Sequence, residues 1–217
     1  MTDAHCHVTG GGTRHFVCGD ASGADVPFYG IHPWDAAADA DIGGIEAMLA
    51  AHPEAGVGEI GLDRLKGREI SAAMIEVFDS QLALAAKYRR PVVLHGAKCW
   101  GKVVARCKPY ARDIPAFLFH GFSRSDGLVP DIVALNGFIS VGPAVLNDHA
   151  VNYRDLVKKI PRDRLLVETD RTAQSAGDCP GVAAVAAKTA EILGAEFAEL
   201  ERQLEANASA FISGERQ

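Results

Sequence analysis

The sequence predicts an α/β protein of the (β/α)8-barrel type, organised as one domain over residues 1–217. Strand-like and helix-like segments alternate along the chain, which is the order that a parallel sheet with crossover helices requires. No Pro/Gly/Ser-rich linker, low-complexity tract or repeat divides the chain into separate units. A generous count gives eight strands, although 217 residues are few against the roughly 250 of a typical barrel.

The predicted strands are short apolar runs, several of which end in a polar residue. The clearest is the run at 91–94, which ends in His95 and is apolar throughout, as a strand buried on both faces is. The runs at 55–62 and 116–119 repeat this pattern and end in Asp63 and His120. In chain order, we expect strands at residues 3–7, 15–18, 26–31, 55–62, 91–94, 116–119, 138–141 and 165–170.

The predicted helices follow from apolar residues at helical spacing. The most regular stripe lies in residues 71–88, with polar residues opposite it and Ser71 placed as the N-cap. Gly137 is placed to close the helix that begins near Leu128, as a C-cap. In chain order, we expect helices at residues 42–49, 71–88, 100–107, 128–135, 153–160, 182–193 and 196–211.

The composition is that of an ordinary globular protein, with 48% apolar residues. It contains no run of about 18 apolar residues and no signal peptide pattern, so we expect a cytoplasmic location and no membrane partner. The five cysteines lack the spacing of a metal site or a disulfide framework and are expected to be reduced. The net charge of −6 argues against a generally basic surface for nucleic acid.

Side chains that can bind a metal recur at the C-terminal ends of the predicted strands. His5 and His7 share one face of the first strand because side chains alternate along a strand, and two such imidazoles can hold one ion. A lone histidine after a strand is more often a core or surface group. In a barrel, however, all strand ends meet at one mouth, where active sites occur. The candidate ligands are His5, His7, Glu59, His95, His120 and Asp170.

Six ligands exceed the four of a tetrahedral zinc site, which points to two ions that share a carboxylate. Glu59 is the expected bridge because it shares a strand face with Gly61 and Asp63, and the small Gly61 is expected to leave room beside the ions. Imidazole-rich ligation favours Zn, Mn or Fe over Mg. The sequence therefore predicts two divalent metal ions at the mouth of the barrel.

Several motifs together resemble those of the TatD family of metal-dependent hydrolases, within the amidohydrolase-like group of barrels. The resemblance covers nearly the full length from Tyr29 onward. The motifs are Asp3-Ala4-His5-Cys6-His7, Gly30-Ile31-His32-Pro33, Gly58-Glu59-Ile60-Gly61-Leu62-Asp63, Pro91-Val92-Val93-Leu94-His95, Phe119-His120-Gly121-Phe122 and Glu168-Thr169-Asp170, with Asn207-Ala208 near the end.

The resemblance implies phosphodiester hydrolysis of DNA, with Glu59 and Asp170 as the catalytic residues. Asp170 is expected to bind metal and also to accept a proton from the attacking water. The nuclease activity of the family is associated with Mg, so the metal stays open among Mg, Zn and Mn. The implied ligands are His5, His7, Glu59 and Asp170 for one ion and Glu59, His95 and His120 for the other.

The chain departs from the family pattern mainly near its start. Family members have two helix-and-strand units between the His-X-His strand and the Gly-Ile-His-Pro strand, but here only 24 residues lie between His7 and His32. We therefore expect an incomplete barrel with one or two early helices missing, and a second copy of the chain as a candidate cover. Arg64, residues 171–173 and Gly121 also replace residues that are usual in the family.

Cationic side chains that follow the strand ends are candidates to bind an anionic substrate, DNA or another phosphoester. The alternative for any one of them is simple solvation of a charged loop. The histidine of this group lies where it can contact a phosphate or order its own loop through a hydrogen bond. The candidate substrate-binding residues are His32, Arg64, Lys98, Arg124 and Arg171.

Two other functions stay open beside DNA cleavage. The same metals can serve a small phosphoester, ester or amide, because such barrels change substrate through their loops. A non-catalytic scaffold can keep metal for stability alone. Oligonucleotides and small esters, screened side by side, separate DNA cleavage from hydrolysis of a small molecule. Metal-dependent stabilisation without any turnover identifies the non-catalytic scaffold.

Overall fold

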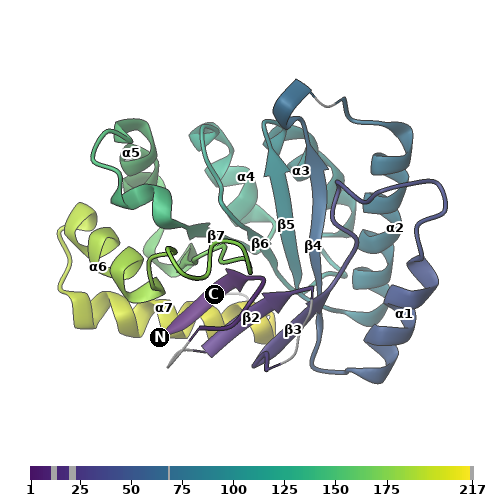
Figure 1. The fold of residues 1–217 in the computed structure, drawn as a ribbon, viewed down its shortest axis with the longest axis horizontal. Coiled ribbons are helices and arrows are strands. Elements are labelled where there is room, and N and C mark those ends of the chain that lie inside the picture. Colours follow the sequence, from purple (N-terminus) through teal and green to yellow (C-terminus); the bar gives the residue numbers. More distant parts are fainter. Residues whose placement is uncertain (11–13, 20–22, 68, 216–217) are drawn as a thin grey trace.

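The computed structural model describes residues 1–10, 14–19, 23–67 and 69–215. It is the predicted α/β barrel: eight parallel strands form one sheet in which the spatial order follows the chain order (Figure 1). The strands are β1 (Thr2–Cys6), β2 (Arg14–Cys18), β3 (Val26–Tyr29), β4 (Gly56–Asp63), β5 (Val92–Ala97), β6 (Phe117–Phe119), β7 (Gly137–Val141) and β8 (Leu165–Val167).

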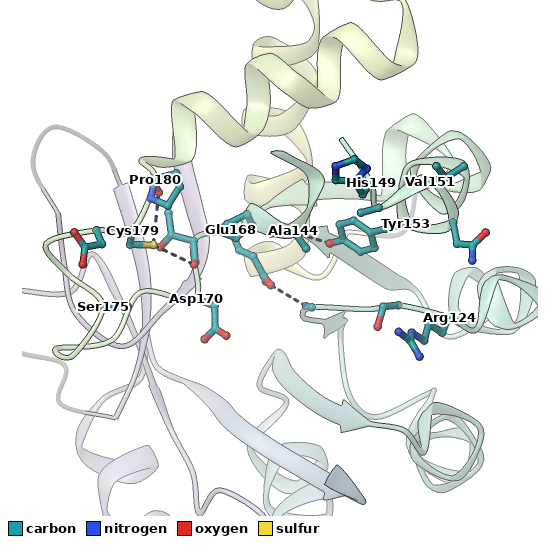
Figure 2. A pocket seen from close by; sticks show the side chains of 18 residues that line it. Arg124, Ala144, His149, Val151, Tyr153, Glu168, Asp170, Ser175, Cys179 and Pro180 are labelled. Atoms are coloured by element: carbon teal, nitrogen blue, oxygen red, sulfur yellow. Dashed lines mark hydrogen bonds between the residues drawn. The ribbon is translucent and has the colours of Figure 1, made fainter. Parts of the chain in front are cut away.

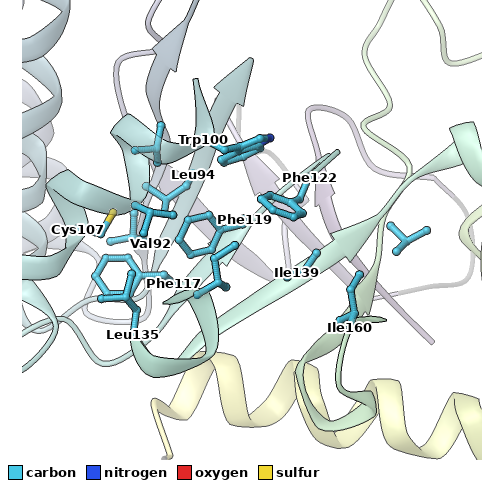
Figure 3. Packing of buried hydrophobic residues seen from close by; sticks show 14 of the residues in the cluster. Val92, Leu94, Trp100, Cys107, Phe117, Phe119, Phe122, Leu135, Ile139 and Ile160 are labelled. Atoms are coloured by element: carbon cyan, nitrogen blue, oxygen red, sulfur yellow. The ribbon is translucent and has the colours of Figure 1, made fainter. Parts of the chain in front are cut away.

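Helices cover the outer face of the sheet from β4 to β8 (Figure 1). Because side chains alternate along a strand, Val92 and Leu94 of β5 face the helices whereas Val93 faces the barrel interior. Figure 3 shows this outer cluster, in which Trp100 contacts Phe119. The helices are α1 (Ile42–Ala51), α2 (Ala72–Tyr88), α3 (Trp100–Cys107), α4 (Val129–Ala134), α5 (Val151–Lys159), α6 (Val182–Leu193) and α7 (Phe197–Ser213).

The helix boundaries agree with the sequence pattern in α2 and differ at the end of α4. The prediction for α2 is confirmed: Ser71 caps it, with its hydroxyl accepting from the Met74 amide at 3.1 Å. Gly137, by contrast, does not cap α4. It opens β7, where a Cβ would lie 2.5 Å from the Ile132 carbonyl oxygen. Asn136 takes the left-handed conformation instead (φ 56°), which asparagine tolerates better than most residues.

The expected loss of the early helices is confirmed within the described residues. No helix forms in the described parts of the β1–β2 and β2–β3 connections, residues 7–10, 19 and 23–25. The sheet nevertheless comes close to a closed barrel, because the Asp170 amide donates to the His5 carbonyl (3.0 Å) and the His7 amide to the Arg171 carbonyl (2.8 Å). The buried Asp3 carboxylate also accepts from the amide and hydroxyl of Thr169. These bonds join the two edges of the sheet.

The C-terminal helix α7 closes the base of the barrel beneath β1 and β2 (Figure 1). Its Phe211 is fully buried and stacks on Phe28 of β3 at 6.0 Å between ring centroids. The same ring contacts Phe16 of β2 at 6.0 Å and Phe138 of β7 at 5.9 Å. One side chain from the end of the chain therefore joins strands from both halves of the barrel.

The strands that lack flanking helices are buried within a single chain. Phe16, Val17 and Phe28 are all fully buried, so covering them does not require a second copy. A homo-oligomer and the cytoplasmic location stay predictions. None of the described helices has the length and apolar content to cross a membrane. The five cysteines form no disulfide, and four of them are buried.

We expect Phe211→Ala to lower the free energy of unfolding by about 3–5 kcal/mol, the usual cost of removing a buried phenyl ring. Phe197→Ala is the matched control, because Phe197 lies on the same helix and is 39% exposed. Phe197→Ala should change the free energy of unfolding by no more than about 0.5 kcal/mol. Urea unfolding followed by circular dichroism measures both. Equal stability losses in the two variants would show that α7 does not close the barrel as described.

Candidate metal centre

The six predicted ligands meet at the C-terminal end of the barrel, around the Glu59 carboxylate. Glu59 lies in the middle of β4, and its side chain is only 5% exposed. The other five side chains come from the ends of four different strands and the residues just beyond them. Three overlapping groups, drawn from these six residues and His32, have ligand atoms within 4.8 Å of one another. The groups are His5–His120–Asp170, His5–His7–Glu59 and His32–Glu59–His95.

The first set of atoms has the spacing of ligands around one ion. Nε2 of His5 lies 3.6 Å from Glu59 Oε2 and 3.4 Å from Asp170 Oδ1. Nε2 of His7 lies 3.4 Å from the same Glu59 oxygen and 3.6 Å from the same Asp170 oxygen. Ligands about 2.0–2.2 Å from a tetrahedral ion lie about 3.3–3.6 Å from one another. Two imidazoles and two carboxylates therefore fit a divalent cation.

The second set uses the other oxygen of Glu59. Oε1 lies 2.6 Å from His95 Nδ1 and 2.5 Å from His120 Nε2, and these two nitrogens are 3.3 Å apart. The histidine of the Gly-Ile-His-Pro motif is farther away, with His32 Nε2 at 3.7 Å from Oε1. Each oxygen of one buried carboxylate thus faces its own pair of imidazoles.

The electrostatics of the site favour a positive charge between the carboxylates. Hydrogen bonds to Asp170 and Glu59 raise the pKa of His7 to about 10. Burial would raise the pKa of Glu59, but the neighbouring His120 and the hydrogen bonds from the histidines outweigh it and lower that pKa. The pKa of Asp170 is also lowered, because the nearby imidazoles of His5 and His7 outweigh its burial. Burial alone dominates at His32 and lowers its pKa to about 4.

His5 supplies a second reason to place a cation here. Its side chain is fully buried, and among the described residues neither of its ring nitrogens has a hydrogen-bond partner. A buried polar atom without a partner is costly. The Nε2 atom faces two carboxylate oxygens that a shared cation would bring into one coordination sphere. The residues present therefore fit the implied metal.

Further polar groups hold the histidines in orientation, as is common around metal sites. Nδ1 of His7 lies 3.1 Å from the Cys18 carbonyl oxygen, and Nδ1 of His120 lies 3.6 Å from Glu168 Oε1. Glu168 is fully buried and also accepts from the Gly121 amide (2.8 Å) and the Ser140 hydroxyl. These contacts hold the Glu168 carboxylate in place beside His120.

Sequence reasoning missed the partner of His95. Its Nε2 lies 3.0 Å from Asp63 Oδ2, and the same oxygen accepts from the indole N–H of Trp34 at 2.7 Å. The position of Asp63 on the face of Glu59 was a visible signal, because residues two and four apart on a strand point the same way. Nothing in the pattern singled out Trp34.

Gly61 is needed for a different reason from the one expected. The φ of Gly61 is +151°, and a Cβ there would lie 2.0 Å from the His95 carbonyl oxygen. The space left by the missing side chain is therefore occupied by the backbone of β5, and it does not lie beside the metal-binding atoms. This close approach sets the distance between the strands that carry Glu59 and His95.

Two cavities open on either side of Asp170. One has a volume of about 730 Å³ and contains Glu59, His95 and Asp170 in its wall. The other has a volume of about 990 Å³, and Figure 2 shows it with Glu168 and Asp170 on one side and Tyr153 and Arg124 on the other. Asp170 itself is 52% exposed and takes a positive φ of 49°, a region that aspartate tolerates better than most residues.

The predicted substrate-binding residues do not all reach these cavities. His32 lines the smaller one and Arg124 the larger one. Arg64 and Lys98 are exposed and are not among the described residues that line either cavity. Side chains alternate in direction along a strand. Asp63 points inward to His95, so the side chain of its neighbour Arg64 points away from the site.

Arg171 also differs from the expectation, because its side chain turns away from the site. Its guanidinium donates to the Cys179 carbonyl at 3.2 Å, and it lines a separate cavity of about 160 Å³ beside Asp3 and His15. The Arg171 backbone instead accepts from the amide of His7 and thereby holds the loop at the site. Of the predicted substrate-binding residues, only His32 and Arg124 are among the described residues that line the two large cavities.

We expect Gly61→Ala to weaken metal binding and lower the melting temperature, because the added methyl group would displace the His95 carbonyl and with it the imidazole. Gly101→Ala is the control, since a Cβ at Gly101 in α3 meets nothing within 4 Å. Calorimetric titration with Mn²⁺ and thermal melts measure the two effects. Unchanged Mn²⁺ affinity in Gly61→Ala would contradict this account of the strand spacing.

Known proteins resemble this chain in sequence and in fold. The family described as TatD related DNase matches residues 19–213. The uncharacterized metal-dependent hydrolase YabD of Bacillus subtilis is 31% identical over 143 residues, which are 65% of this chain and 56% of YabD. The 3'-5' ssDNA/RNA exonuclease TatD of Edwardsiella piscicida is 30% identical over 149 residues, 65% of this chain and 55% of that protein.

The chain therefore spans about half the length of the curated relatives that it matches. Among solved structures, the TatD homologue YjjV of Escherichia coli K12 superposes with a TM-score of 0.81 at 23% identity. That superposition covers 97% of this chain and 96% of YjjV, and it supports the barrel fold. On the extent of the family match, the chain belongs to the TatD family, described as TatD related DNase.

Proposed function

We propose that this protein is a hydrolase that uses two divalent metal ions to cleave phosphodiester bonds in DNA. The observation that carries the proposal is the arrangement at Glu59, where the two oxygens of one buried carboxylate face two separate pairs of imidazoles. Two-metal sites of phosphatases and nucleases share ligands in this manner. The ligands would be His5, His7, Glu59 and Asp170 for one ion and Glu59, His95 and His120 for the other.

When bound, the two ions would supply Lewis acidity that lowers the pKa of water and offsets the charge of a phosphoryl group. Asp170 is the proposed proton acceptor. Its carboxylate is ionised, because its pKa is lowered, and half of its side chain is open to the two cavities. Glu59 is deeply buried and faces only histidines in its described contacts, so its proposed role is to hold the ions.

The shape of the site supports a substrate longer than one nucleotide. The cavities of about 730 and 990 Å³ both include Asp170 in their walls, so a chain that crosses Asp170 can place groups on both sides. His32 on one side and Arg124 on the other are the proposed phosphate contacts. The name of the Edwardsiella relative, a single-strand DNA/RNA exonuclease, agrees with a polymeric substrate.

A small phosphoester is the second candidate substrate, and one observation favours it. Arg124 is the only lysine or arginine among the described residues that line the two cavities. Binding of a polyanion commonly uses several such residues. Aryl phosphodiesters and oligonucleotides, assayed side by side, separate the two candidates.

We expect the wild-type protein to cleave a single-stranded oligodeoxynucleotide when Mg²⁺, Mn²⁺ or Zn²⁺ is added. Cleavage should stop when EDTA is added. Glu59→Ala should lose at least about a hundredfold in rate, because even supporting groups around metal ligands cost 10–100-fold. Glu54→Ala is the control, since Glu54 is an exposed carboxylate just before β4.

Metal content measured by mass spectrometry should fall from about two ions per chain to fewer in Glu59→Ala. A fully metallated wild-type protein that cleaves no nucleic acid would overturn the nuclease proposal. Turnover of small esters by that protein would then identify the second candidate. Retention of full activity in Glu59→Ala would overturn the two-metal site itself.

A further inference from the structure

An exposed tryptophan stands in the wall of the smaller cavity, beside the candidate metal ligands. Trp34 is 53% exposed, whereas the other tryptophan, Trp100, is 5% exposed and packed in the core. Trp34 shares the cavity wall with Glu59 and His95. Large aromatic side chains are usually enriched where they contact a partner or ligand. The position of this indole therefore calls for a functional explanation.

The indole is held in one orientation by its polar edge. Its Nε1–H donates to Asp63 Oδ2 at 2.7 Å, and its backbone amide donates to His32 Nδ1 at 3.2 Å. The His32 ring stands edge-on to the indole, at 4.9 Å between centroids and 90° between planes. Asp63 is fully buried and also accepts from the Leu65 amide. Trp34 is thus exposed and at the same time fixed in place.

The same carboxylate oxygen fixes a candidate metal ligand. Asp63 Oδ2 lies 3.0 Å from His95 Nε2, and an ionised carboxylate can only accept, so the proton of this bond sits on His95 Nε2. Nδ1 of that ring then faces Glu59 Oε1 at 2.6 Å. One oxygen atom therefore sets the position of the indole relative to the imidazole that the proposed function assigns to metal binding.

The cavity walls carry little positive charge in their described residues, so an aromatic contact would add affinity for nucleic acid that charge does not supply. Arg124 is the only lysine or arginine among the described residues of the two cavity walls, and it belongs to the larger cavity. Among the described residues, none on the Trp34 side is therefore a lysine or arginine placed to contact phosphate. Stacking of a base on an aromatic ring supplies affinity without positive charge, and it accepts any base because every base has a π-face.

We propose that Trp34 stacks against an unpaired base next to the cleaved phosphate and that it is the residue that makes the site prefer single strands. This inference rests on the proposed function. A base within a duplex already stacks on its neighbours and offers no free face to the indole, whereas an unpaired base does. Asp63 acts as a positioning residue, because it holds the indole and His95 in a fixed relation.

The test compares Trp34→Ala with Trp34→Phe on two substrates, oligothymidylate and an abasic oligomer with the same phosphate backbone. We expect Trp34→Ala to raise KM for oligothymidylate about tenfold or more, with little change in kcat and none in KM for the abasic oligomer. Trp34→Phe keeps an aromatic face and should restore most of the affinity. Phe197→Ala, an exposed aromatic residue remote from the cavities, is the control.

Fluorescence gives a readout that does not depend on cleavage. With two tryptophans in the chain and Trp100 buried, oligothymidylate should quench the emission of the wild-type protein saturably, and the abasic oligomer should not. The quenching should vanish in Trp34→Ala. Quenching without cleavage would uphold the stacking inference while overturning the nuclease proposal. Absence of base-dependent quenching, or equal KM changes for both substrates, would overturn the inference even in an active enzyme.

Discussion

The burial of the Glu59 carboxylate is the constraint on which the rest of the site depends. A buried negative charge is tolerated only when it is paired and hydrogen-bonded, and Glu59 meets this condition through three strands, β1, β5 and β6, that deliver four histidines to its two oxygens. The parallel barrel makes the arrangement possible, since all strand ends meet at one mouth. Asp63 then lies within hydrogen-bond distance of the outer nitrogen of His95, and Glu168 lies 3.6 Å from that of His120.

The barrel keeps this mouth intact although the early helices are absent from the described residues. The amides of His7 and Asp170 bridge the first and last strands directly at the site, so the bonds that join the sheet edges also place two candidate ligands. At the opposite end, Phe211 fills the base against Phe16, Phe28 and Phe138. The shortened N-terminal region therefore changes how the barrel is covered, while the candidate ligands still meet at its mouth.

Strand periodicity and strand ends were sufficient to predict the barrel and the clustering of the six candidate ligands, because both follow from local pattern and parallel topology. The side-chain directions of loop residues were not predictable in this way. Arg171 turns to the Cys179 carbonyl, and Gly61 makes room for the His95 backbone. The link from Trp34 through Asp63 to His95 joins three segments far apart in the chain, and no local pattern encodes it. The family comparison supports the fold and the family, whereas the proposed substrate depends on the geometry of the site.

The most direct test of the account is a crystal structure of the protein grown with Mn²⁺, with anomalous scattering used to locate the metal. The account predicts two anomalous peaks per chain, one beside each oxygen of Glu59, with His5 and His7 next to one peak and His95 and His120 next to the other. A single peak, or peaks that do not contact Glu59, would contradict the claim that this carboxylate bridges two ions.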